Sequence, residues 1–479
     1  MFTSSSSPSQ SDLHRPAGAF LILGFVWTIS LLVLISPLAS NLALKVFFLA
    51  VPVGLSIFVT ISRPRDGFVI WAFGVSLLAT QTGFQLDIGP YRTSALELAI
   101  VFLISLIFLL RHRGTSIPLA HYPGRRLFVF FATYASVMLV FSLILDTPLS
   151  VALSQFKGFL FYPLLGYILV AGLRSRRSLD WLVMILAGWY LAVGLNGIYQ
   201  FAVNQGQEIF FRTSAGYAPS NIFGVTVAII AVLLIGINSH QSPLRMPRWL
   251  GYLVALVLIA AAVTSLSRTA VIALVAGFLF LFLQRRIRHG YLLLIPIALA
   301  VITLVILPDD IFTYRIFQLT DSSSTRRFSY LYSGVQAWRA NWLVGWGWGR
   351  SFVATGAAPS NMVDFWHSLW NDVSLVSRHA QPWYHNDYLN LAVQIGLVGL
   401  LLYLAFWQQV FARTRRWLRE FPDSPLVGYV QGSAAALFAF LVGANFDHLL
   451  WRPDAAGIVG LLLGLLLVSM RLGESEVNG

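Results

Sequence analysis

The chain contains no cysteine and very few charged side chains. Without thiols, disulfides and thiolate metal sites are excluded. Charged residues make up 11% of the 479 residues and hydrophobic residues 57%, whereas a soluble domain carries about 25% charged residues. The composition therefore excludes an ordinary soluble domain and predicts a polytopic membrane protein.

Lysine is nearly absent as well. Lys45 and Lys157 are the only two lysines, so arginine supplies most of the basic charge behind a formal net charge of +13. In a transmembrane chain this excess predicts contact with membrane lipid headgroups or substrate phosphates, and no nucleic acid is expected as a partner. Residues 1–16 are polar and Ser-rich and lack the pattern of a signal peptide. We expect them to form a disordered cytoplasmic tail.

Apolar stretches long enough to cross a bilayer, about 20 residues each, recur along the chain. They predict an all-α bundle of about 14 transmembrane helices, within a range of about 12–14. About eleven spans fall in residues 17–308 and about three in residues 389–479, which end in a short cytoplasmic tail. Residues 309–388 form one long polar insertion between these two groups.

Arginines concentrate in every second predicted loop, for example at Arg111, Arg113, Arg125 and Arg126. Positively charged loops stay in the cytoplasm. The pattern therefore predicts that both termini are cytoplasmic and that the loop of residues 309–388 faces outward.

Two arginines lie in outward segments close to predicted helix starts. Arg212 is followed by Asn221 just before the eighth predicted span, and Arg268 lies in a tight reversal between the ninth and tenth spans. Burying an unpaired guanidinium costs several kcal/mol, so Arg268 needs an anionic partner. That partner is either a substrate phosphate or, if the side chain snorkels, a lipid headgroup.

The long loop contains one segment with helical periodicity. Apolar residues recur there at spacings of three and four, namely at Phe328, Leu331, Val335, Trp338 and Trp342. This spacing predicts an amphipathic helix on the outer membrane surface, with Ser324 or Thr325 as its N-cap.

Arg326 and Arg327 then lie in the first turn of that helix, where cations oppose the helix dipole. Together with free backbone amides they are suited to hold an anion. The alternative is a pair of solvated loop arginines.

The segment Gly345-Trp346-Gly347-Trp348-Gly349 follows this helix. Alternating glycines are typical of a tight turn or a close backbone approach. A phosphate-binding loop is a weak alternative, since no strand precedes the segment. The ring of Trp348 is suited either to stack on a sugar or to anchor at the membrane interface.

His385 lies in Tyr384-His385-Asn386-Asp387, directly before a predicted span, and Asn386 or Asp387 is a suitable cap for that helix. An imidazole here is a candidate general base, although a capping or packing role is the alternative. Competing histidines are His367, His379 and His448. They lack the ligand spacing of a zinc site, so neither a metal nor another cofactor is predicted.

These motifs, in this order around one large outward loop, resemble the O-antigen ligase and polymerase superfamily of bacterial membrane glycosyltransferases. The residues that carry the resemblance are Ser267-Arg268-Thr269-Ala270, Arg326-Arg327, Gly345-Trp346-Gly347, His385-Asn386-Asp387-Tyr388-Leu389 and Gly396-Leu397-Val398-Gly399. The register to the glycine turn favours Arg327 over Arg326. Gln394 departs from the acidic residue of many members, which places an acidic helper there in doubt.

The resemblance implies a GT-C-like fold in the bacterial inner membrane, with a periplasmic catalytic loop. It implies transfer of a glycan from undecaprenyl diphosphate to a hydroxyl acceptor, without a metal. His385, Arg268 and Arg327 would be catalytic. Weaker candidates for substrate binding are Arg326, Arg212, Asn221, Tyr384, Asn386 and Trp348.

The runner-up function is a transporter of a small anion or a lipid-linked glycan. Transporters place polar groups at the bilayer midplane on broken helices, within repeated halves. This chain shows no internal repeat, and its conspicuous charges cluster on one predicted face. The sequence therefore favours the enzyme.

Overall fold

A computed structural model describes residues 85–88, 91–94, 123–173, 175–204, 220–240, 247–284, 322–350, 384–450 and 452–478. Its elements are β1 (Gln85–Ile88), β2 (Tyr91–Ser94), α5 (Arg125–Ile144), α6 (Leu149–Gly172), α7 (Arg176–Asn204), α8 (Ser220–Asn238), α9 (Arg248–Thr264), α10 (Arg268–Leu283), α13 (Ser322–Ala340), α17 (Asp387–Glu420), α18 (Val427–Gly443) and α19 (Pro453–Asn478). The described part is helical apart from the antiparallel pair β1–β2. That hairpin is the one departure, within these residues, from the expected all-α fold.

Five of the described helices are long and apolar enough to cross a membrane. They cover Arg125–Ile144, Arg176–Val203, Ser220–Asn238, Asp387–Glu420 and Ala455–Glu476. The helices α9, α10 and α18 are shorter and also apolar. A polytopic membrane protein is thus confirmed, while the count of about 14 spans stays a prediction because several candidate spans and residues 1–16 lie outside the described residues.

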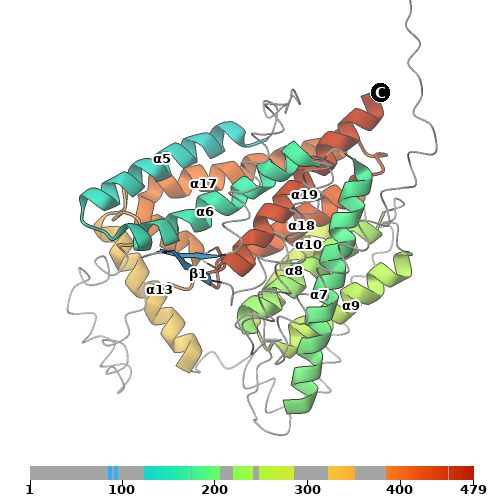
Figure 1. Ribbon diagram of the computed structural model, residues 1–479, viewed down its shortest axis with the longest axis horizontal. Coiled ribbons are helices and arrows are strands. Elements are labelled where there is room, and N and C mark those ends of the chain that lie inside the picture. Colours follow the sequence, from blue (N-terminus) through green and yellow to red (C-terminus); the bar gives the residue numbers. More distant parts are fainter. Residues whose placement is uncertain are drawn as a thin grey trace, which may run out of the picture.

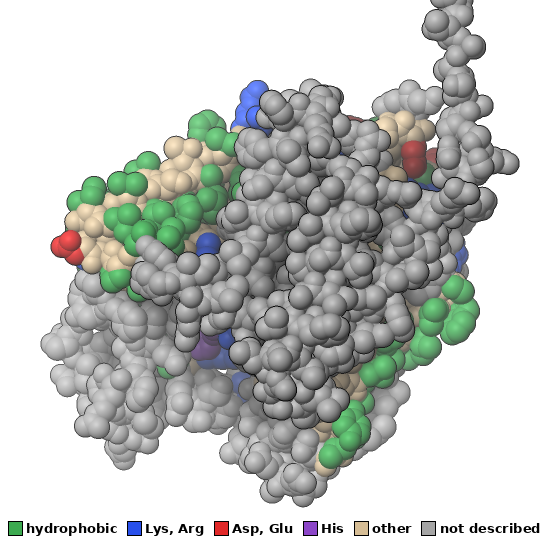
Figure 2. Space-filling model, in the orientation of Figure 1, with side chains coloured by type: hydrophobic (Ala, Val, Ile, Leu, Met, Phe, Trp, Pro, Cys, Tyr) green, Lys and Arg blue, Asp and Glu red, His purple; other side chains and the backbone are tan. Residues whose placement is uncertain are grey.

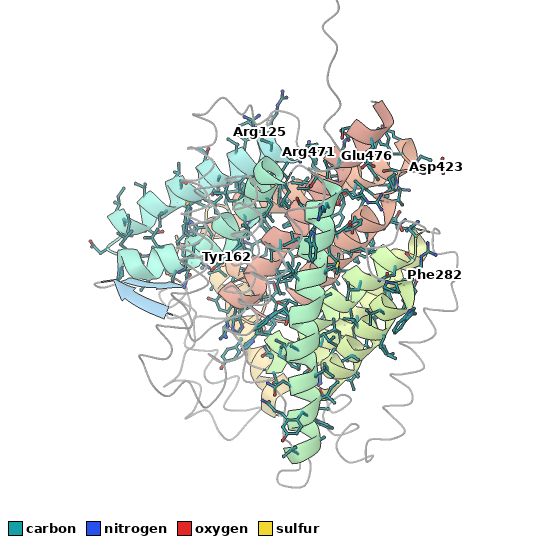
Figure 3. The ribbon with its side chains drawn as sticks, turned by 45° about the vertical axis from the view of Figure 1, so that its right-hand side comes forward. Arg125, Tyr162, Phe282, Asp423, Arg471 and Glu476 are labelled. Carbon is teal, nitrogen blue, oxygen red and sulfur yellow. The ribbon has the colours of Figure 1, made fainter. Side chains whose placement is uncertain are left out.

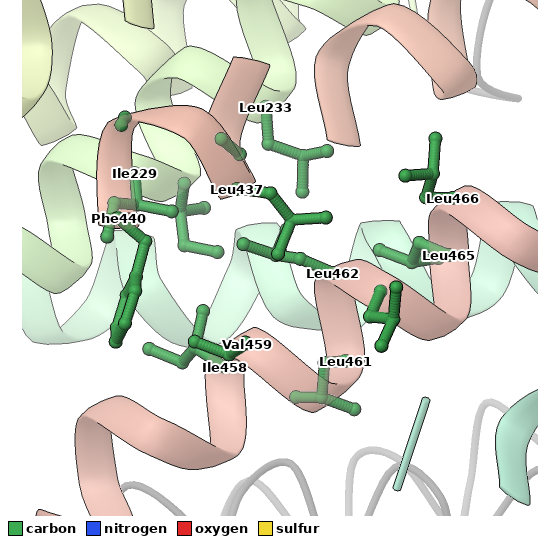
Figure 4. Packing of buried hydrophobic residues seen from close by; sticks show 14 of the residues in the cluster. Ile229, Leu233, Leu437, Phe440, Ile458, Val459, Leu461, Leu462, Leu465 and Leu466 are labelled. Atoms are coloured by element: carbon green, nitrogen blue, oxygen red, sulfur yellow. The ribbon is translucent and has the colours of Figure 1, made fainter. Parts of the chain in front are cut away.

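The bundle is organised around α18 and α19. Figure 1 shows these helices in the centre, with α5, α6 and α17 on one side and α7, α8, α9 and α10 on the other. Leu and Ile side chains of α8, α18 and α19 interdigitate between them, as Figure 4 shows for Leu233, Leu437 and Leu462. The side chains of α8 are apolar on all sides, and the helix is accordingly almost entirely enclosed by its neighbours.

Small residues let the central helices approach closely. A Cβ on Gly236 of α8 would collide with the backbone of Gly432 in α18. Such small-residue contacts drive helix association where lipid removes the hydrophobic driving force. The outer surface of α5, in contrast, exposes Val129, Phe130 and Ile144, and Figure 2 shows hydrophobic side chains along it. This face is suited to contact lipid.

The helix α17 is broken inside its apolar stretch. Ile395 and Gly396 leave the helical conformation, with φ/ψ of −124°/18° and 66°/−173°. In lipid, backbone groups freed by such a break must find partners within the protein.

Residues 342–347 supply those partners. Trp346 N donates to Val393 O at 2.9 Å and Gly347 N to Gln394 O at 2.8 Å, while Leu397 N donates to Trp342 O at 2.8 Å. Tyr134 Oη donates to Ile395 O at 3.2 Å. The alternating glycines therefore serve a close backbone approach.

Replacing Gly345 with Ala is expected to destabilise the protein by at least about 2 kcal/mol. Gly345 has φ 85°, and an added Cβ would lie 2.5 Å from Gln394 O and Gly396 N. Thermal unfolding in detergent measures the effect. Gly188→Ala in α7 is the matched control, because a Cβ there meets nothing within 4 Å. Equal melting temperatures for the two variants would contradict the close backbone approach between residues 342–347 and α17.

The bundle has two distinct ends. Arg125, Asp423, Arg471 and Glu476 gather at one end, at the top of Figure 3. At the other end α8, α10, α17 and α19 begin and α9 and α18 finish. This second end, called the site end below, carries the candidate functional residues.

Candidate functional site

The helix α13 lies against the start of α17. The two helices approach closely at Gly334, where a Cβ would lie 2.6 Å from Leu389 Cδ2 and 2.8 Å from Tyr384 Cγ. Ala337 is fully buried in a small cluster with Tyr384 and Val393. Small residues on one face of α13 thus fix its position on α17.

The expected amphipathic helix is present, but its predicted N-cap was wrong. It begins at Ser322, so Ser324 and Thr325 lie in its first turn and are not its N-cap. Leu331 and Trp342 of the predicted apolar face are exposed, as side chains facing a membrane surface would be, whereas Gly334 and Ala337 pack against the start of α17. Contact of the exposed stripe with a membrane surface stays a prediction.

The residues Asn386 and Asp387 organise the start of α17. Asn386 Oδ1 accepts from Leu389 N at 2.9 Å, which confirms the predicted cap. Asn386 Nδ2 donates to Asn445 O at 3.0 Å, and Asp387 Oδ2 accepts from Leu450 N at 2.8 Å. Both side chains therefore hold the link between α18 and α19 against the start of α17. His385 directly precedes these two residues.

Asp447, in that link, is the centre of the site. It is fully buried. Its Oδ1 lies 3.2 Å from His385 Nδ1 and 3.0 Å from His448 Nδ1, and it also accepts from His448 N at 2.9 Å. Its Oδ2 accepts from Asn221 Nδ2 and lies 4.0 Å from an Arg327 guanidinium nitrogen. Four separate segments of the chain meet on this one carboxylate.

These donors keep Asp447 ionised. Burial raises the pKa of the Asp447 carboxyl, but hydrogen bonds from His385 and His448, and the nearby charges of His448 and Arg327, outweigh burial and hold its pKa well below the usual range. Hydrogen bonds to the charged form of a buried carboxylate have this effect. A fixed negative charge therefore lies beneath the histidines.

His385 is held in one orientation. A carboxylate next to Nδ1 favours the tautomer with its proton on Nδ1, which leaves the lone pair on Nε2. The ring stacks on Tyr330, with centroids 5.6 Å apart, and is about a fifth exposed. His385 also has φ 48°, a left-handed conformation rare outside glycine. Backbone strain of this kind clusters at functional sites.

Arg327 reaches the same site from α13. Besides approaching Asp447, its guanidinium donates to Phe446 O at 3.3 Å. The side chain is about one third exposed, so only part of its donor capacity faces the protein. An anion bound beside His385 would meet this cation.

Arg268 starts α10 at the same end of the bundle. The preceding residues form the tight reversal expected from the sequence, with Leu266 at φ 48° and Ser267 Oγ accepting from Ala270 N at 3.4 Å. Thr269 lies next to Gly443, the last residue of α18, since a Cβ on Gly443 would be 3.7 Å from Thr269 Cγ2. The chain from Gly443 leads directly to Asp447. The start of α10, where Arg268 lies, therefore adjoins the end of α18 that leads into the Asp447 link.

Three predicted substrate-binding residues have structural contacts. Trp348 is fully buried, and its Nε1 donates to Ala135 O at 2.9 Å, so its ring is enclosed rather than offered to a sugar. Tyr384 is buried against α13. The side chain of Asn386 hydrogen-bonds Leu389 N in the helix cap and Asn445 O. Asn221 is within the site through Asp447. Arg212 and the side chain of Arg326 lie outside the described residues.

From the sequence, His448 was only a competitor of His385, and no role was predicted for Asp447 or Tyr330. The signal for Asp447 was a carboxylate in a short link between two apolar helices, where charge is costly. Tyr330 follows Arg327 by three positions and hence shares its helix face. Within the described residues, His385, Asp447 and His448 are also grouped closely enough to be metal ligands.

Taken together, fold and site define a class: a helical membrane protein with a cationic, imidazole-containing polar site at one end of its bundle. Residues 252–404, about a third of the chain, match the family model described as O-antigen ligase (Wzy_C). This match confirms the resemblance to the O-antigen ligase and polymerase superfamily. A search of curated proteins finds no match. The matched segment contains Arg268, Arg327 and His385, and it ends before Asp447.

Proposed function

We propose that the protein transfers an oligosaccharide from undecaprenyl diphosphate to a hydroxyl acceptor at the outer face of the bacterial inner membrane, as a ligase or a polymerase. The observation that carries the proposal is the constellation His385–Asp447–Arg327. It combines an oriented base with a cation at the end of an apolar bundle, where a lipid-linked donor would arrive.

The chemistry follows from the roles of these groups. Nε2 of His385 takes the proton of the acceptor hydroxyl, whose oxygen attacks the anomeric carbon of the donor. The bond between that carbon and the diphosphate oxygen breaks, and its electron pair leaves with the lipid diphosphate. Arg268 and Arg327 stabilise the charge that develops there, a role that a divalent cation fills in other transferases. One displacement without a nucleophilic side chain inverts the configuration.

The distribution of arginine supports the orientation. The described helix ends opposite the site carry Arg125, Arg176, Arg248 and Arg419. Positive-inside topology would make that end cytoplasmic and the site end periplasmic. A periplasmic site faces the leaflet in which a flipped lipid-linked glycan would reside.

A transporter is less well supported. The broken helix α17 is the feature that a transporter would use to coordinate an ion or substrate. Here the freed backbone groups of residues 393–398 are occupied by residues 342–347 and Tyr134. The break in α17 therefore serves to bind residues 342–347, and its backbone groups are not available to coordinate an ion.

The direct test supplies purified protein with a defined undecaprenyl-diphosphate glycan in EDTA, together with either lipid A–core or a second lipid-linked glycan as acceptor. Product with one acceptor, formed in EDTA, is expected and also separates ligase from polymerase. If no donor is turned over with any acceptor, the proposal fails.

In the same assay, Arg268→Gln and Arg327→Gln are each expected to lower turnover by at least about 100-fold, because each removes a charge that stabilises the leaving group. Arg339→Gln is the matched control, since Arg339 is exposed in the last turn of α13. Similar activity in the Arg327 and Arg339 variants would remove Arg327 from the mechanism.

A further inference from the structure

The nitrogen and oxygen atoms at the centre of the site form a compact triangle. His385 Nδ1 and His448 Nδ1 lie 3.2 and 3.0 Å from Asp447 Oδ1, and the two nitrogens lie 3.3 Å from each other. Zinc binds imidazole nitrogen at about 2.0–2.1 Å and carboxylate oxygen at about 2.0–2.2 Å. Two ligands at a tetrahedral angle are then about 3.3–3.5 Å apart. The triangle thus has nearly the size of one face of a zinc coordination shell.

Hydrogen bonds to Asp447 do not explain all three contacts of this triangle. When both Nδ1 atoms donate to the same Asp447 oxygen, the contact between the two nitrogens is not a hydrogen bond, since neither accepts. The rings meet edge to face with centroids 4.8 Å apart. A cation at the centre would instead be bound by all three atoms at once.

We propose that His385, His448 and Asp447 form an inhibitory site for a divalent transition metal. Two imidazoles and a carboxylate suit zinc, copper or nickel and do not suit magnesium or calcium, which require oxygen ligands. Sequence spacing gave no hint of this site, because its ligands come from the start of α17 and from the link between α18 and α19. Zinc is the probe of choice because it has no redox chemistry.

Metal binding at Nδ1 of His385 would prevent this residue from acting as a base. A neutral imidazole that binds a metal through Nδ1 carries its proton on Nε2. The lone pair on Nε2, which would accept the acceptor's proton, is then lost. The metal also takes the Asp447 oxygen that orients His385. The inhibition rests on the proposed function, whereas the metal binding itself does not.

Arg327 distinguishes this site from adventitious binding. Its guanidinium lies 4.0 Å from Asp447 Oδ2 and opposes a second cation. Arg327→Gln is therefore expected to bind zinc more tightly than the wild type, although the same change lowers transfer activity. A metal bound elsewhere on the surface would not respond to Arg327.

The test uses protein purified without a polyhistidine tag, stripped with EDTA and dialysed. Zinc is titrated against a chromogenic chelator in the absence of substrate. One bound equivalent is expected. Loss of an outer-shell partner alone weakens metal binding about 10–100-fold, so His448→Gln, which removes a ligand, should weaken it by at least about 100-fold. His240→Gln is the control, since His240 lies beyond the far end of α8.

Melting temperatures of the variants show whether each still folds, and zinc-edge X-ray absorption reports whether two imidazoles coordinate the metal. Equal zinc binding in the wild type and a folded His448→Gln variant would overturn the site. So would a bound zinc without imidazole ligands, or unchanged affinity in Arg327→Gln. Zinc binding without any glycan transfer would retain the metal site and reject the proposed function, and transfer without zinc binding would do the reverse.

Discussion

Replacing His385 with Asn is expected to lower glycan transfer by about 10²–10⁴-fold, the usual contribution of a general base. The variant should still fold, because Asn tolerates the left-handed conformation that His385 adopts at φ 48°. Turnover in the purified transfer assay measures the effect, and size-exclusion profile and melting temperature report the fold.

The control for this variant is His240→Asn. His240 hydrogen-bonds Gln431 at the far end of α8, away from the site. Donor binding should survive in His385→Asn, since the arginines remain. Wild-type turnover by a folded His385→Asn protein would show that another group accepts the proton.

Asp447→Asn is expected to cause a loss of similar size, about 10²–10⁴-fold, because the base is then no longer fixed in the required tautomer. The two oxygens of Asp447 face donors only: His385, His448, Asn221 and Arg327. An Asn amide must direct its own N–H groups at some of these donors. Steady-state kinetics should show a fall in kcat, and the melting temperature should drop as well.

Asp146→Asn provides the matched control. Asp146 is an exposed carboxylate in the turn between α5 and α6, and its φ of 62° also suits Asn. Its replacement should leave transfer and stability unchanged. If Asp447→Asn retained full kcat while Asp146→Asn behaved as expected, Asp447 would have no part in orienting the base.

Much of the local structure could be predicted because it depends on neighbouring residues. The reversal before Arg268 follows from two apolar runs separated by a few polar residues, and the cap by Asn386 follows from side-chain chemistry at a helix start. Hydropathy alone places the start of the apolar span in α6 near Phe159, whereas the helix begins at Leu149. The reason is that Gln155 and Lys157 interrupt the apolar run, although the side chain of Gln155 is buried and accepts from Gly349 N at 3.1 Å. Hydropathy cannot recognise such a partner.

The centre of the site depends on tertiary contacts and could not be predicted in full. Asp447 becomes significant only because α13, α17 and α8 bring Arg327, His385 and Asn221 to it. The glycine-rich segment was ambiguous for a similar reason: only the break in α17 explains why its backbone must approach so closely. For Trp348 a sugar and the membrane interface were both open as partners, because the sequence did not show Ala135 O, its partner in the core.

We propose that Arg268, Arg327 and His385 all act on one bound donor. A cryo-EM structure of His385→Asn with an undecaprenyl-diphosphate glycan in a lipid nanodisc tests it most directly, because the variant should bind the donor without consuming it. We expect a diphosphate in contact with the guanidinium groups of both Arg268 and Arg327, with the first sugar next to residue 385. A diphosphate bound in a different cavity, or one that reaches only one of the two arginines, would contradict it.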